Sequence, residues 1–279
     1  MILKKITAAG INWTQLNRTG GAWYSLCVTP TGRIIAGSGG GGIWYSDDNG
    51  INWAQSNKTD RAWYSLCVTP TGRIIAGSTR FIWYSDDNGI NWAQSNKTDR
   101  AWHSLCVTPT GRIIAGSDIA GIWYSDDNGI NWAQSNKTDL PWLSLCVIPT
   151  GRIIAGSTSG IWYSDDNGIN WTQSNKKDRY WDSLCVTPTG RIIAGSDGAG
   201  IWYSDDNGIN WTQSNKTDRA WLSLCVTPTG RIIAGSDIAG IWYSDPGYTA
   251  VCTKYLDQKG AQEIVTQFKA YCDNLVGGA

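Results

Sequence analysis

The chain has 279 residues and carries equal numbers of basic and acidic side chains, 23 Lys plus Arg against 23 Asp plus Glu. A net charge of zero argues against a nucleic-acid partner, and against an anionic membrane surface, held by bulk electrostatics. The sequence has no signal-peptide core and no transmembrane run, so we expect a chain made in the cytoplasm and not inserted in a membrane.

Six near-identical units fill most of the chain. Each begins with the string Trp-x-Ser-Leu-Cys-Val, and the step between units is 39 or 40 residues. The six starting residues are Trp23, Trp63, Trp102, Trp142, Trp181 and Trp221. A tandem repeat of this length is typical of solenoids, propellers and arrays, in which one supersecondary unit recurs.

Each unit reads as four short strands. In the second unit, aromatic and β-branched runs alternate with turn residues, which predicts strands at 63–68, 73–76, 81–84 and 90–94. Turn chemistry at 69–72, 77–78 and 86–89 separates these runs. No helical period runs through the unit, which excludes a helical solenoid. Four antiparallel strands in about 40 residues make one propeller blade.

The two ends of the repeat region indicate a ring. The last unit stops at 244–246, where the other units continue into Asp-Asn-Gly-Ile-Asn-Trp. The missing piece stands at the other end of the chain, because residues 10–15 match residues 208–213. We therefore predict an all-β, six-bladed β-propeller of four-stranded antiparallel blades over residues 10–245, in which strand 11–16 completes the last blade.

The turn between the third and fourth strands carries the motif Ser-x-Asp-x-Gly-x-x-Trp in five complete copies. This motif resembles the Asp-box (BNR) repeat of sialidase-like propellers, and the resemblance implies a structural role. The chemistry agrees, because Asp accepts hydrogen bonds from local backbone amides and Gly permits positive φ. The residues to which we assign this role are Ser46, Asp48, Gly50, Trp53, Asp87, Asp127, Asp166 and Asp206. The motif lacks the ligand spacing and distal Glu of a calcium loop, so we expect no metal and no cofactor.

The copies differ on one rim of the predicted ring. The first and third turns of a blade share one edge, which we call the constant rim because these turns hardly change between units. The second turn and the blade-to-blade connection share the opposite edge, the variable rim. Variable loops on a rigid scaffold are typical of a recognition surface, although relaxed constraint on loops is the alternative. The candidate ligand-binding residues are Tyr24, Tyr64, Arg80, Phe81, His103, Asp118, Leu143, Tyr180, Asp182, Asp197, Leu222 and Asp237.

Catalysis is disfavoured by the residues themselves. Sialidases need three arginines from different blades and a Tyr–Glu pair, whereas the only Glu here is Glu263, outside the propeller, and the arginines occupy repeat positions. Nothing marks a pair of Asp carboxylates for glycoside hydrolysis. We expect no catalytic residue, and a lectin-like binding protein that recognises a glycan or a protein receptor. The alternatives are a sialidase-like glycoside hydrolase and a structural or assembly scaffold.

Residues 246–279 form a separate C-terminal extension. Apolar residues from Ala261 to Leu275 recur at steps of three and four, which predicts an amphipathic helix at about 260–275. This helix would dock on the propeller or mediate self-association. The segment resembles terminal segments of phage tail and fibre proteins, which implies a virion-associated viral adhesin. Six of the eight cysteines occupy one repeat position as small buried residues, so only Cys252 and Cys272 could form a bridge.

Overall fold

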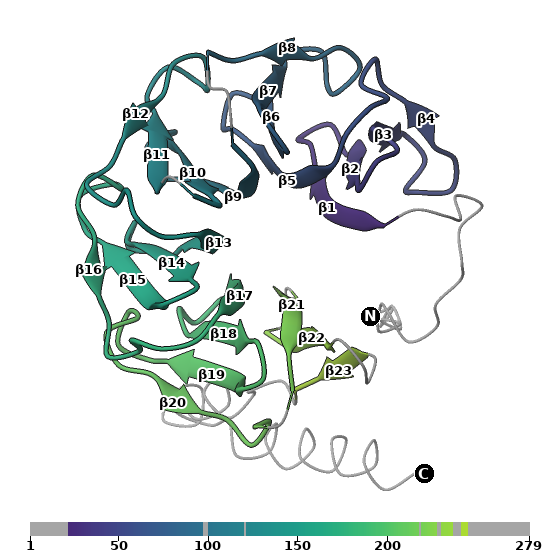
Figure 1. Cartoon of the computed structure of the whole chain (residues 1–279). Helices are drawn as coiled ribbons and strands as arrows, with labels where there is room; N and C mark the ends of the chain where they lie inside the picture. Colours follow the sequence, from purple (N-terminus) through teal and green to yellow (C-terminus); the bar gives the residue numbers. More distant parts are fainter. Residues whose placement is uncertain are drawn as a thin grey trace, which may run out of the picture.

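The computed structural model describes residues 22–96, 100–119, 121–217, 219–227, 230–236 and 241–244. These residues form six antiparallel sheets arranged around a central axis, which is a six-bladed β-propeller (Figure 1). The all-β fold predicted from the repeats is therefore confirmed. The described residues contain no helix that could span a membrane.

Each blade runs in chain order from the axis outward. Blade 1 consists of β1 (Trp23–Val28), β2 (Ile34–Ser38), β3 (Ile43–Ser46) and β4 (Ala54–Gln55). Blade 2 consists of β5 (Trp63–Val68), β6 (Ile74–Ser78), β7 (Ile82–Ser85) and β8 (Ala93–Gln94). Blade 3 consists of β9 (Trp102–Val107), β10 (Ile113–Ser117), β11 (Ile122–Ser125) and β12 (Ala133–Gln134). Blade 4 consists of β13 (Trp142–Val147), β14 (Ile153–Ser157), β15 (Gly160–Ser164) and β16 (Thr172–Gln173).

Blade 5 consists of β17 (Trp181–Val186), β18 (Ile192–Ser196), β19 (Gly200–Ser204) and β20 (Thr212–Gln213). Blade 6 consists of β21 (Trp221–Val226), β22 (Ile232–Ser236) and β23 (Ile241–Tyr243), so its sheet has three strands within the described part of the chain.

The fourth strand is shorter than the sequence predicts. We expected residues 90–94 to be extended, but only Ala93 and Gln94 join the ladder, where they pair with Tyr84 and Trp83. The preceding residues belong to the turn, because the backbone N–H of Asn91 donates to Asp87 Oδ1 at 2.8 Å. At Asn91 a hydrogen bond to the Asp87 side chain thus replaces pairing with the neighbouring strand.

The hydrophobic core lies between the blades. One cluster joins Ile35 and Ile43 of blade 1 to Trp63 and Ile74 of blade 2, and all four side chains are fully buried. The same arrangement recurs between blades 2 and 3, 3 and 4, and 4 and 5. Each of these clusters therefore contains side chains of two neighbouring blades, as in other repeat folds.

A glycine in each second strand permits this close approach. A Cβ atom on Gly77 would lie 2.6 Å from the carbonyl oxygen of Trp102 in the next blade and 2.5 Å from Ser65 Oγ. Equivalent contacts exist at Gly37, Gly116, Gly156 and Gly195. The constant Gly of the Ile-Ile-Ala-Gly-Ser string is thus explained by blade-to-blade packing.

Blade 1 has no packed neighbour on one side among the described residues. Leu26 and Val28 are 65% and 62% exposed, whereas their equivalents Leu66 and Val68 pack into the core cluster of the first two blades. Figure 1 shows this open side between β1 and blade 6. The predicted closing strand 11–16, the extension 246–279 with its helix, and Cys252 and Cys272 lie outside the described residues, so those predictions stay predictions.

Candidate recognition rim

The Asp-box turns are held by internal hydrogen bonds. Ser85 Oγ donates to Asp87 Oδ1 at 2.9 Å and accepts from the backbone N–H of Gly89 at 2.9 Å. Burial raises the pKa of Asp87, but hydrogen bonds from Asn91 and Ser85 outweigh it and keep that pKa below the usual value. Asn88 completes the turn with a φ of 62°, a left-handed conformation that Asn tolerates. These contacts leave the motif little capacity to bind a ligand.

Arginine side chains join neighbouring blades at the constant rim. Arg73 makes two hydrogen bonds to Asp86, at 2.6 and 2.8 Å, and a third to the carbonyl oxygen of Asn128 in the next blade at 3.0 Å. Its guanidinium also covers the Tyr84 ring at 4.4 Å. The arrangement recurs at Arg33, Arg112 and Arg152. Each arginine therefore acts as a clamp between blades.

The two variable stretches meet on the opposite rim. In each of blades 1 to 5, the first residue of the second turn donates its backbone N–H to the carbonyl oxygen of the residue before the first Trp. The five bonds are Gly39 to Ala22, Thr79 to Ala62, Asp118 to Ala101, Thr158 to Pro141 and Asp197 to Tyr180, at 2.7 to 3.3 Å. The two variable stretches of each of these five blades thus lie side by side on this rim.

Three aromatic side chains from consecutive blades form a stack, which we call the aromatic arc. The ring centroids of Tyr24 and Tyr64 are 5.5 Å apart, and those of Tyr64 and His103 are 4.7 Å apart. All three follow the first Trp of their units, on strands that lie nearest the axis (Figure 1). The arc therefore borders the centre of the variable rim. Burial lowers the pKa of His103, and the charge of Asp118 opposes this shift.

The equivalent positions of blades 4 to 6 are chemically different. They are Leu143, Asp182 and Leu222. Burial, and secondly the charge of Asp197, raises the pKa of Asp182 to about 6. Its Oδ2 atom is buried and accepts no hydrogen bond within the described structure. The variable rim thus has an aromatic half and a half that combines aliphatic side chains with a desolvated carboxyl.

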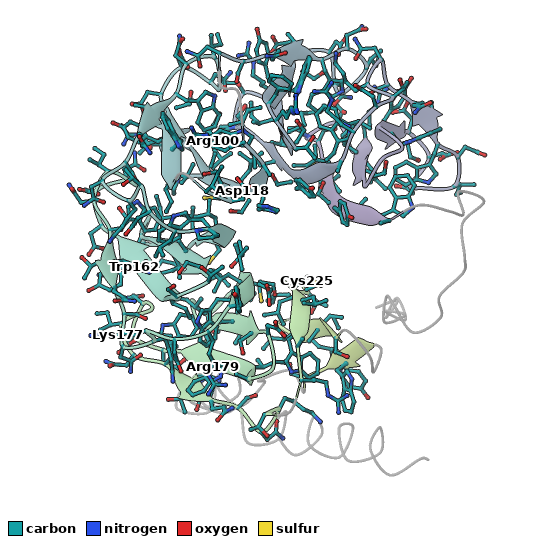
Figure 2. The ribbon with its side chains drawn as sticks, viewed as in Figure 1. Arg100, Asp118, Trp162, Lys177, Arg179 and Cys225 are labelled. Carbon is teal, nitrogen blue, oxygen red and sulfur yellow. The ribbon has the colours of Figure 1, made fainter. Side chains whose placement is uncertain are left out.

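The remaining candidates are scattered. Phe81 packs edge-on against Trp83 with a centroid distance of 6.1 Å, so it belongs to the blade core rather than to the arc. Tyr180 is 51% exposed and Arg80 is also exposed. Figure 2 places Asp118 near the centre of the ring, whereas Lys177 lies at its outer edge. Asp237 lies outside the described residues.

Sequence reasoning missed a set of lysine contacts between blades. Lys58, after the last strand of blade 1, places its Nζ 3.8 Å from the Trp83 ring of blade 2. Lys137, Lys176 and Lys216 cover Trp162, Trp202 and Trp242 in the same way. The signal was available, because Asn-Lys follows the fourth run of every complete unit. Each of these cation–π contacts joins a lysine of one blade to a tryptophan of the next blade.

In the ranges that the structure covers, no three His, Cys, Asp or Glu side chains gather into a group that could hold an ion. The repeated cysteines are free thiols, and burial raises the pKa of Cys67, Cys106 and Cys146. Thiols of this kind are unreactive.

Five segments match the model of the BNR/Asp-box repeat, at residues 44–55, 83–94, 123–134, 162–173 and 202–213. The chain therefore carries five copies of this repeat, at the positions that the sequence motif predicted. No curated protein matches the chain as a relative.

Solved structures share the fold at low sequence identity. YCF48 bound to a D1 peptide superposes with a TM-score of 0.67 at 18% identity, covering 85% of this chain and 81% of YCF48. The GH74 enzyme of Niastella koreensis gives a TM-score of 0.64 at 16% identity, over 80% of this chain and 36% of the enzyme.

The extracellular domain of a one-component system from B. thetaiotaomicron gives a TM-score of 0.61 at 12% identity, over 82% of this chain and 39% of that domain. This chain thus spans well under half the length of two of these three proteins. Likeness at such identities establishes a common propeller fold only.

Proposed function

We propose that this Asp-box propeller is a non-catalytic recognition module that binds a glycan or a protein receptor through its variable rim. The observation that carries the proposal is the pairing of the two variable stretches across the rim in blades 1 to 5, beside the aromatic arc. Tyr and His offer stacking surface and hydrogen bonds at a low entropic cost. Because the six copies differ at this surface, it suits one asymmetric partner better than six identical small ligands.

The repeats supply a conservative test of this proposal. The position of Tyr24, Tyr64 and His103 holds Leu143 and Leu222 in two other blades, so leucine fits the backbone there. We expect the triple variant Tyr24→Leu, Tyr64→Leu, His103→Leu to fold and to lose binding on glycan and protein arrays. The control is Ile130→Ala at the constant rim, where the Ile130 side chain is 41% exposed. Binding that survives the triple change but fails in the control would refute the rim assignment.

A glycoside hydrolase remains the second candidate because of one carboxyl pair. Asp182 has a pKa raised to about 6, with the charge of Asp197 contributing, and this is the environment of a general acid. Among the proteins with a similar fold is the GH74 enzyme. Hydrolysis of chromogenic glycosides that disappears in both Asp182→Asn and Asp197→Asn would favour the enzyme. Receptor binding without turnover would favour the module.

We also propose that strand 11–16 completes blade 6 and closes the ring. The match of residues 10–15 to residues 208–213 supports this step, as does the exposure of Leu26 and Val28 on the side of blade 1 that faces blade 6. Under this proposal Tyr24 and Leu222 become neighbours, and the variable rim is continuous. A role as the receptor-reading head of a virion-associated adhesin is consistent with such a surface and is part of the proposal.

A further inference from the structure

A cavity opens around the axis at the constant rim, on the face opposite the proposed recognition surface. Its volume is about 870 Å³, and it is lined by the Val-Thr-Pro segments that follow from the inner strand of each blade. Its valines are Val28, Val68, Val107, Val147, Val186 and Val226. Five prolines of these segments add further apolar surface.

The polar groups of this cavity are already engaged. Thr69 Oγ1 lies 2.9 Å from Thr71 Oγ1. Thr29, Thr108 and Thr187 each make the equivalent hydrogen bond to the threonine two residues later. Blade 4 carries Ile148 in place of the threonine. No charged side chain lines the cavity within the described residues. A surface of this kind suits an apolar occupant.

The chain leaves blade 6 on the same rim. The strand β23 starts after the second turn, at the variable rim, and runs to the opposite edge. There Ser244 donates its backbone N–H to the carbonyl oxygen of Ile232, at the start of β22. The inner and third strands of a blade lie about 10 Å apart, so the chain leaves close to the cavity.

The segment that follows has suitable length and pattern. Residues 245–260 can extend about 50 Å at 3.3 Å per residue, more than enough to reach the axis. Beyond them the apolar residues stand at steps of three and four, on one face of the predicted helix: Ala261, Ile264, Val265, Phe268, Tyr271, Cys272 and Leu275.

We propose that residues 261–275 of the same chain cover this cavity, with their apolar side chains against the valine and proline ring. An apolar helix face that lies in an apolar hollow is a common recognition mode. The short connection keeps the segment at a high effective concentration beside the cavity, which favours its own propeller over a second copy. The proposal concerns the constant rim, so it stands or falls independently of binding at the variable rim.

Photo-cross-linking in the full chain tests this contact directly. With p-benzoylphenylalanine in place of Phe268, we expect cross-links to tryptic peptides such as 62–73, located by fragmentation to Val68–Pro70 or its equivalents. In a mixture of equal amounts of ¹⁴N- and ¹⁵N-labelled protein, each cross-link should join two peptides that carry the same isotope, because both belong to one chain. Cross-links to the variable rim, mixed-isotope cross-links that reveal a second copy, or no cross-link would each overturn the proposal.

A dye-binding comparison gives a second readout. Phe268→Asp places a charge in the apolar face, whereas Gln267→Asp places the same charge outside it, so the two variants are matched. We expect only Phe268→Asp to raise the fluorescence of an apolar-surface dye such as ANS, because only this change uncovers the valine ring. Equal dye binding by wild type and both variants would contradict the proposal.

Discussion

At the scale of single residues, the arginine clamps illustrate how charge and geometry combine. Arg112 makes two hydrogen bonds to Asp126, at 2.6 and 2.8 Å, and one to the carbonyl oxygen of Asn167 at 3.0 Å. Lysine keeps the charge but lacks the planar fork that makes three such bonds at once. Arg112 therefore stabilises the blade junction through the geometry of its hydrogen bonds as well as through its charge.

We expect Arg112→Lys to lower the free energy of unfolding by about 1–2 kcal/mol, because charge-assisted bonds are lost at a blade junction. Arg191 is the comparison, since it binds Asp205 in the same way but its side chain is 47% exposed, against 14% for Arg112. Arg191→Lys should cost less, because water screens a more exposed ion pair. Chemical denaturation of both variants measures this difference, and equal losses would contradict a larger contribution from the more buried arginine.

Asp182 should make stability depend on pH. Its pKa in the folded protein is raised to about 6 by burial and by Asp197, so the folded state holds a proton more tightly than the unfolded state does. The stabilisation that comes from the proton on Asp182 is therefore fully present below the unfolded pKa of about 4, and it is lost as the pH rises through about 6.

Partial exposure reduces the effect of this shift, so we expect a loss of about 1–2 kcal/mol between pH 4 and pH 7. Asp182→Asn cannot ionise, so thermal unfolding should find it more stable than wild type at pH 8 and no more stable at pH 4. A variant whose advantage is the same at both pH values would show that ionisation is not the cause.

At the scale of elements, the narrow space between blades requires a glycine in the second strand. A Cβ atom on Gly116 would lie 2.6 Å from Ser104 Oγ and 2.8 Å from Trp142 Cβ in the next blade. Since Trp142 is fully buried and its Cβ cannot move aside freely, we expect Gly116→Ala to destabilise the protein by about 2–3 kcal/mol. Denaturant titration measures this loss, and a neutral result would mean that the blades are packed less closely.

Many of the strand bounds are predictable from the sequence, because six copies of one unit repeat the same pattern of runs and turns. The first strand of blade 2 has its predicted bounds at Trp63–Val68, since a run of aromatic and branched residues ends at a proline turn. The fourth strand was predicted too long because its Asn91 bonds to Asp87 instead of joining the ladder. Phe81 lies in the second turn, and its ring packs on Trp83, a contact that no periodicity encodes.

The candidate site was only partly predictable for the same reason. Antiparallel topology alone indicates that the two variable stretches share a rim, and five backbone hydrogen bonds join them. The stacking of Tyr64 on Tyr24 and His103 depends on the distance between neighbouring inner strands, which the sequence does not state. The raised pKa of Asp182 likewise depends on the burial that its neighbours impose.

At the scale of the whole molecule, ring closure determines whether the six blades act as one body. Gly235 in blade 6 corresponds to Gly116, yet the nearest atom to a Cβ at Gly235 is 3.7 Å away, because no blade packs there within the described residues. If the ring closes, Trp23 covers Gly235 as Trp142 covers Gly116.

We therefore expect Gly235→Ala to cost about as much as Gly116→Ala, about 2–3 kcal/mol, in the same denaturant titration. An open arc would leave the Gly235 variant within a few tenths of a kcal/mol of wild type apart from backbone effects, and would refute closure by strand 11–16.

The recognition proposal is tested most directly by hydrogen–deuterium exchange of the full chain, free and bound to the receptor that the arrays identify. We predict slower exchange on binding at residues 22–26, 39–42, 62–66 and 101–105, where the paired variable stretches and the aromatic arc lie. The turns at 69–72, 86–89 and 126–129 on the constant rim should be unchanged. Protection confined to those constant-rim turns, with the variable rim unaffected, would contradict the account.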